Sequence, residues 1–95
     1  MSEINESMVP IVNESILSRK NADGKLALMS LEDDENFFKI EGLAIQVWEN
    51  IDGKCNIKAI VEKVSDTYNL PKKKLEEDTF KFIDDLYKEG IIKFN

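Results

Sequence analysis

The sequence predicts a small α+β domain in which a three-stranded antiparallel sheet is followed by three helices. The chain has 95 residues, which suits a single domain. Its first half contains short apolar runs separated by turn residues. Its second half carries apolar residues at spacings of three and four, between glycine and proline residues that end helices.

A hairpin is predicted at the start of the sheet. Residues 15–20 and 25–31 flank the run Asn21-Ala22-Asp23-Gly24. Asp and Gly tolerate the backbone angles of a chain reversal, so this run predicts the turn of the hairpin. The Ala, Leu and Met within 26–31 also favour a helix, but the flanking turn and the polar run that follows favour a strand.

A third strand is predicted after an acidic run. The run Glu32-Asp33-Asp34-Glu35 is interpreted as a solvated loop. Four carboxylates could also bind a hard cation, but the spaced ligands of a calcium loop are missing. Residues 36–40 then form the strand, with Phe38 and Ile40 on one face and Phe37 and Lys39 on the other.

Three helices are predicted from the remaining apolar spacing. They run from Glu41 to Asp52-Gly53, from the N-cap Asn56 to Tyr68, and from Pro71 to Gly90. Glycine can take the left-handed conformation that closes a helix. The apolar stripe of the third helix holds Leu75, Thr79, Phe82, Ile83 and Leu86. Residues 91–94 either form a short terminal strand or pack back on the domain.

Composition excludes several classes of site. One Cys and no His leave no zinc finger, no disulfide framework and no Cys/His or Ser/His/Asp catalytic set. No signal peptide or membrane span is found, and the unpaired Cys55 favours a cytoplasmic protein. Cys55 is expected to have no basic or His partner at its thiol, so it is interpreted as inert. Residues 1–13 are predicted to be a flexible segment before a domain of residues 14–95, with Pro10 favouring an extended path.

The second and third helices have the lengths of a helix-turn-helix pair, which is best known from DNA-binding proteins. Charge opposes that function. The formal net charge is −6, and the third helix carries six acidic residues against five lysines. The sequence therefore predicts a winged helix-turn-helix shape without nucleic-acid binding, and a winged-helix DNA-binding or regulatory protein is the alternative. An acyl carrier is disfavoured because no serine stands in the Asp-Ser-Leu context that attachment needs.

One long run resembles a known family. The run is Ile40-Glu41-Gly42-Leu43-Ala44-Ile45-Gln46-Val47-Trp48-Glu49-Asn50-Ile51-Asp52-Gly53, and it resembles the signature of the PqqD-like family. That signature is a strand ending in Leu-Asn, a helix of small and aliphatic residues with an aromatic or Leu, and an Asp-Gly turn. Further positions match in order and spacing: Ile57, Ile60, Val64, Tyr68, Leu70, Phe82, Leu86, Gly90 and Ile91. Glu41 departs from the usual Asn and is a weaker helix cap.

The resemblance, over residues 14–94, implies binding without catalysis. Such domains are recognition elements for ribosomally made, modified (RiPP) peptides, and act as chaperones that hold a leader peptide for a modifying enzyme such as a radical-SAM maturase. The leader adds as a strand to the sheet edge beside the third helix. In this chain the edge would be Phe37, Phe38, Lys39 and Ile40, and the opposite wall Phe80, Asp84, Tyr87 and Lys88. No catalytic residue, metal, cofactor, nucleic acid or membrane is implied.

Plainer interpretations exist for these residues. Phe38 and Ile40 suit the core, because one strand face must pack on the helices. Phe80 and Tyr87 are seven residues apart and off the apolar stripe, so they form either an exposed aromatic ridge or part of the core. By default, the charged residues of the wall belong to a solvated helix face.

Overall fold

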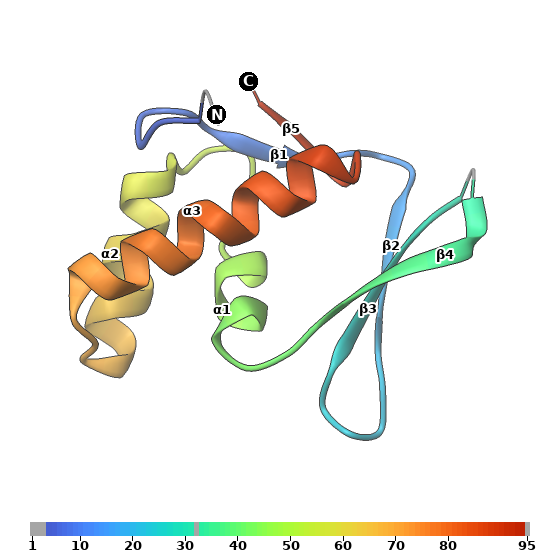
Figure 1. The fold of residues 1–95 in the computed structure, drawn as a ribbon, viewed down its shortest axis with the longest axis horizontal. Coiled ribbons are helices and arrows are strands. Elements are labelled where there is room, and N and C mark those ends of the chain that lie inside the picture. The colour runs from blue at the N-terminus through green and yellow to red at the C-terminus, as the bar shows by residue number, and fades with distance from the viewer. Residues whose placement is uncertain (1–3, 32, 95) are drawn as a thin grey trace.

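The computed structural model describes residues 4–31 and 33–94. A three-stranded sheet lies on one side of the molecule, three helices lie on the other, and a two-stranded sheet joins the two ends of the chain (Figure 1). The predicted α+β fold, a three-stranded antiparallel sheet followed by three helices, is confirmed. The elements are β1 (Pro10–Val12), β2 (Ile16–Lys20), β3 (Leu26–Ser30), β4 (Asp33–Ile40), α1 (Leu43–Glu49), α2 (Ile57–Tyr68), α3 (Lys72–Lys88) and β5 (Ile92–Phe94).

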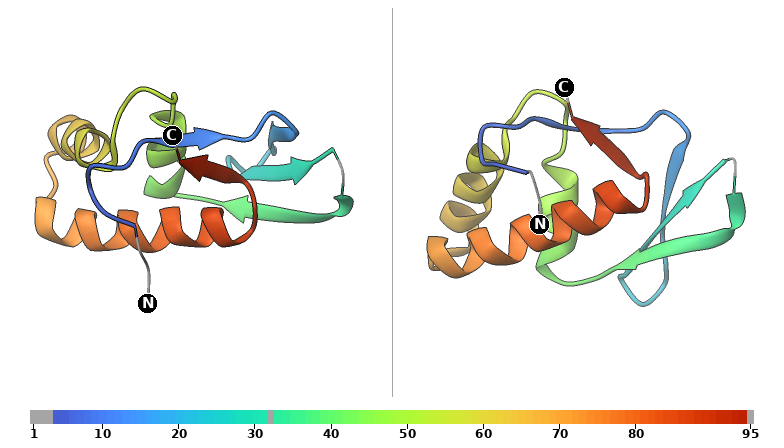
Figure 2. Two further views of the ribbon diagram at one scale, coloured as in Figure 1. Left: turned by 90° about the horizontal axis from the view of Figure 1, so that it is seen from above. Right: turned by 45° about the horizontal axis from the view of Figure 1, so that its top comes forward.

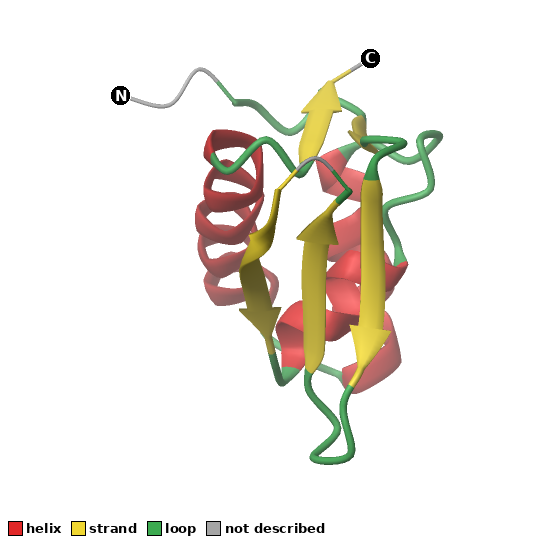
Figure 3. Ribbon diagram, turned by 90° about the vertical axis from the view of Figure 1, so that its right-hand side faces the viewer, coloured by secondary structure: helices red, strands yellow, loops and turns green. Residues whose placement is uncertain are grey.

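The larger sheet has the strand order β2-β3-β4, with both pairings antiparallel. The predicted hairpin turn forms, with the Asp23 carboxylate accepting a hydrogen bond from the Lys25 N–H at 3.0 Å. Leu28 and Ile40 are 1% and 3% exposed on the face that meets the helices. One face of this sheet is therefore part of the core, and the other is turned away from the helices (Figure 3).

The acidic run does not form the predicted loop. Asp33, Asp34 and Glu35 belong to β4, and Glu32 lies outside the described residues. The pairing register shifts between Met29, which lies opposite Phe37, and Ser30, which lies opposite Asp33. A bulge of this kind accommodates extra residues in one strand without ending the ladder. The loop prediction did not allow for this irregular continuation of the strand.

The helices bury most of the residues that their periodicity predicts, but Phe82 of the α3 stripe is only half-buried. Ile57, Ile60 and Ile83 are fully buried in one apolar cluster that α1, α2, α3 and the sheet share. Asn56 caps α2 as predicted, because its side-chain oxygen accepts the Ala59 N–H at 2.8 Å. Helix α3 follows α2 after a short connection, in the order of a helix-turn-helix pair.

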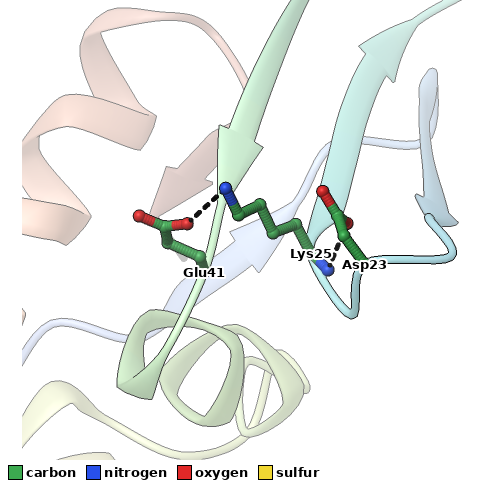
Figure 4. A network of polar contacts seen from close by, with 3 residues as sticks. All are labelled: Asp23, Lys25 and Glu41. Atoms are coloured by element: carbon green, nitrogen blue, oxygen red, sulfur yellow. Dashed lines mark hydrogen bonds and ion pairs between the residues drawn. The ribbon is translucent and has the colours of Figure 1, made fainter.

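The first helix is shorter than predicted at both ends. It begins at Leu43, after Gly42 at φ 64°, and ends at Glu49, so neither Glu41 nor Asp52-Gly53 belongs to it. Glu41 instead pairs with Lys25 across the sheet, at 3.0 Å between Nζ and Oε2 (Figure 4). The hydrogen bond and charge of Glu41 raise the pKa of Lys25. Because both side chains are well exposed, this pair contributes little to stability.

The N-terminal segment has partners in the structure. Strand β1 pairs antiparallel with β5, so residues 91–94 form the terminal strand rather than merely packing back. Pro10 is fully buried, and the backbone oxygens of Glu6 and Met8 accept hydrogen bonds from the start of α2 at 3.1 and 3.0 Å. The boundary between a flexible 1–13 and a domain 14–95 stays a prediction, and these contacts favour a domain that starts before residue 14.

Removal of residues 1–13 tests this boundary. We expect the shortened protein to unfold at lower urea concentration, with a loss of roughly 2 kcal/mol or more, because β5 loses its partner and apolar core surface becomes exposed. Urea unfolding followed by circular dichroism measures the change. An unchanged midpoint would place the boundary at residue 14, as predicted from the sequence.

Candidate functional site

Two hydrogen bonds of the β2–β3 hairpin establish the phase of the backbone ladder. The Asn21 N–H donates to the Lys25 oxygen, and the Leu31 N–H donates to the Ser15 oxygen, both at 2.8 Å. In an antiparallel ladder, alternate residues of a strand bond to the same neighbour. The odd-numbered residues of β3 therefore bond to β2, and its even-numbered residues bond to β4.

This phase determines which backbone groups of β4 are unpaired. Phe38 lies opposite Leu28 and Ile40 opposite Leu26, so Phe38 and Ile40 bond to β3. The backbone N–H and C=O groups of Phe37 and Lys39 point to the other side. Among the strands of the described residues, β4 has no neighbour there. An added peptide strand would find unpaired donors and acceptors at this edge.

Helix α3 lies on the same side of the molecule as β4, whereas β2 lies on the opposite side (Figure 2). The rings of Phe38 on β4 and Phe82 on α3 are 6.5 Å apart at an interplanar angle of 52°. Side chains three, four and seven residues from Phe82 share its side of the helix. Of the residues at these spacings, Leu75, Thr79 and Leu86 are buried toward the core, and Asp78, Asp85 and Glu89 are exposed. The wall of α3 beside β4 is thus one half-buried aromatic ring flanked by carboxylates.

A hollow of about 850 Å³ adjoins this wall. Its lining includes Ile16 of β2, Leu28 and Ser30 of β3, and Phe37 and Phe38 of β4, and the other side is formed by the linker before β2 and by the turn after α3. That turn depends on Gly90, at φ 75°, where the Ile91 N–H bonds to the Leu86 oxygen at 3.0 Å. Asn13 fastens the linker to it, with Nδ2 2.6 Å from the Gly90 oxygen.

The four predicted edge residues divide by face. Phe37 and Lys39 are exposed, Phe38 is half-buried against Phe82, and Ile40 is buried. The expectation that Phe38 and Ile40 face the core is confirmed. Ile40 can therefore take part in binding only through its position in the strand.

The four predicted wall residues do not meet β4. Phe80 and Asp84 line a hollow of about 290 Å³ with Ile4 of the N-terminal segment. The ring of Tyr87 lies 5.1 Å from that of Phe94 on β5. Lys88 pairs with Asp84 at 3.0 Å. Two residues turn a helix by about 200°, so Phe80 lies on the far side of α3 from Phe82.

Comparisons with known proteins identify the family and the fold. The model of the family described as coenzyme PQQ synthesis protein D (PqqD) matches residues 25–92. The chain belongs to the PqqD family. No curated protein matches it. Among solved structures, "TbiB1 in Complex with the TbiA(beta) Leader Peptide" is similar, with a TM-score of 0.74 and 16% identity over 87% of this chain and 94% of that chain. At this identity the likeness concerns the fold.

The helix-turn-helix of this PqqD-family chain does not present a basic surface. Acidic and basic side chains are interspersed on the exposed part of α3. Lys74 pairs with Asp78 at 3.7 Å, and Lys88 with Asp84 at 3.0 Å. A DNA-binding role would need the acids turned inward, whereas Asp78, Asp85 and Glu89 are exposed.

The expectation about Cys55 was wrong in one respect. Lys63, eight residues later on α2, places Nζ 3.1 Å from the sulfur. The hydrogen bond to Cys55 raises the pKa of Lys63, and the charge interaction between the two side chains raises it further. The helix brings this neighbour close, so inspection of adjacent residues could not find it. In the described part of the chain, no cluster of three His, Cys, Asp or Glu side chains is placed to hold a metal ion. Nor is any helix there long and apolar enough to cross a membrane.

Two parts of the candidate site were not predicted from the sequence. They are the linker that contains Asn13 and the side of α3 that contains Phe82. Phe82 was assigned to the buried stripe, and its position beside β4 depends on how α3 docks. Gly90 was found as a helix stop, which is the only signal in the sequence for the turn that closes the hollow.

Substitution of Gly90 by alanine tests the turn. No atom lies within 4 Å of the added Cβ, so the cost is that of the positive φ alone. We expect the free energy of unfolding to fall by about 1 kcal/mol. Urea unfolding measures it, with Glu89→Ala as the control, since Glu89 is exposed with φ −81°. If Gly90→Ala were as stable as Glu89→Ala, the turn would not require glycine at this positive φ.

Proposed function

We propose that this protein is a non-catalytic chaperone for the leader segment of a ribosomally synthesised precursor peptide. The leader binds by strand addition at the open edge of β4 and is presented to a modifying enzyme. The observation that supports this most directly is the outward direction of the Phe37 and Lys39 backbone groups, on a strand that lines the hollow between the sheet and the turn after α3. Membership of the PqqD family and the leader peptide in complex with TbiB1, the similar solved structure, support the same function.

The two faces of a leader strand bound at this edge would meet different surroundings. Side chains of a strand alternate between faces, so every second leader residue would point toward Phe38 and Phe82. The residues between them would continue the outer face of the sheet, next to Phe37 and Lys39. Backbone hydrogen bonds would then supply affinity for any extended segment, and the half-buried aromatic pair would select an apolar side chain.

The proposed chemistry belongs to the partner. The chain has one Cys and no His, and its proposed site consists of backbone groups, aromatic rings and carboxylates. The partner we propose is a maturation enzyme of the radical-SAM class, acting in the cytoplasm where the precursor is made. Phe37, Phe38 and Lys39 are the proposed edge contacts, with Phe82 taking the place on α3 that the sequence assigned to Phe80.

A pair of proline substitutions tests strand addition. Lys39→Pro removes an N–H that points to the open edge of β4, while the β3–β4 ladder stays intact. Ser18→Pro is the matched control, because the same ladder phase turns the Ser18 N–H toward the open edge of β2. We expect Lys39→Pro to weaken binding of the fluorescent leader peptide encoded beside this protein by about tenfold or more, and Ser18→Pro to leave it unchanged. Fluorescence anisotropy measures both affinities.

Three outcomes are informative. Equal binding of the leader to wild type and to Lys39→Pro would exclude the β4 edge. Loss of binding in Ser18→Pro alone would move the peptide to β2. A wild-type protein that binds no neighbouring leader would contradict the chaperone function itself.

A further inference from the structure

The outer face of the β2-β3-β4 sheet carries a row of apolar side chains. Leu17 lies opposite Met29, and Met29 lies opposite Phe37, so the three form one row across all three strands. Leu17 is 49% and Phe37 60% exposed, and Leu31, just beyond β3, is 66% exposed. Figure 3 looks onto the sheet, with the helices behind it. None of the helices covers this row.

Such a row is unusual on a sheet with one solvated face. The outward positions of these sheets are normally polar, because only the inward face is buried. A contiguous exposed apolar patch on a soluble protein is typical of an interaction surface. A leader strand added to β4 would meet this row only at Phe37, and it would leave Leu17 and Met29 uncovered. Peptide binding therefore leaves the exposed apolar side chains of β2 and β3 on this face without an assigned function.

The next row of the same face is basic. Arg19 lies opposite Ala27, which lies opposite Lys39. Both cations are exposed, and within the described residues neither forms an ion pair. In the row beyond, Lys25 is neutralised by Glu41 (Figure 4). In the part of the chain that the structure describes, the face thus pairs an apolar row with two cations that form no ion pair, in a chain whose formal net charge is −6.

We propose that the modifying enzyme docks on this outer face. An apolar patch of the enzyme packs on Leu17, Met29 and Phe37, and enzyme carboxylates pair with Arg19 and Lys39. The docking surface of the enzyme would be apolar where it meets the apolar row and acidic where it meets the basic row, because interfaces pair complementary surfaces. This inference rests on the proposed chaperone function, because it names the surface through which the enzyme would be recruited.

The position of the face favours the enzyme over a second copy of the chain. Face-to-face pairing of two copies would bring the same two cations into one interface. The face is also continuous with the proposed peptide site, since Phe37 and Lys39 belong to β4. A leader strand on β4 would extend the sheet, so an enzyme docked on the outer face would lie beside the bound peptide.

Two charge substitutions on β2 test the proposal. Leu17→Glu and Arg19→Glu alter the face two strands away from the proposed leader edge. Tyr68→Glu is the matched control, because Tyr68 is 44% exposed on α2. The purified enzyme encoded beside this protein is titrated into each full-length variant by calorimetry, and leader affinity is measured in parallel. We expect Leu17→Glu and Arg19→Glu to weaken enzyme binding by about tenfold or more, with leader affinity and the Tyr68→Glu control unchanged.

Enzyme affinity that is equal in all variants, or a wild-type protein that does not bind the enzyme, would overturn the proposal. Sedimentation measures whether a second copy of the chain occupies the face instead. A wild-type dimer that Leu17→Glu dissociates would assign the face to that second copy. Failure of the chaperone function gives a different result, since the wild-type protein would then not bind the leader. Unchanged leader affinity in the variants also confirms that they are folded.

Discussion

The position of β4 at the end of its sheet is the constraint on which the rest of the proposed site depends. A central strand satisfies its backbone groups on both sides, as β3 does, whereas an edge strand leaves alternate groups unpaired. Because Phe38 and Ile40 bond to β3, the free groups are those of Phe37 and Lys39. A shift of the pairing by one residue would exchange these two sets and also turn the core face outward.

Exposed edges invite unwanted pairing, and proteins usually cover or charge them. Here α3 stands beside the edge of β4, where Phe82 meets Phe38 and carboxylates extend along the helix. That wall places an aromatic ring and carboxylates next to the edge of β4. The opposite edge, β2, carries exposed Arg19 and Lys20 and has no helix of this kind beside it. Two edges of one sheet can thus differ in function because only one is flanked by a helix.

The three surfaces of the sheet have separate roles in this picture. The inner face is part of the core through Leu28 and Ile40. The edge of β4 would bind the peptide, and the outer face would bind the enzyme. A binding edge next to a docking face would bring the two partners together on one small domain.

Local signals in the sequence determined most of the elements. Apolar spacing predicted the buried residues of α2 and α3, Asn56 predicted the cap of α2, and the Asp-Gly turn predicted the β2–β3 hairpin, because each depends on interactions between residues close in the chain. The ends of α1, the bulge that takes Asp33 into β4, and the pairing of β1 with β5 were missed or left open, since they depend on contacts between distant residues. The sequence by itself thus determined the α+β class and the resemblance to the PqqD family, and that resemblance implied which strand forms the edge. Only the tertiary structure decided that Phe82, and not Phe80, faces that edge, because the rotation of α3 about its axis is determined by its packing against the whole core.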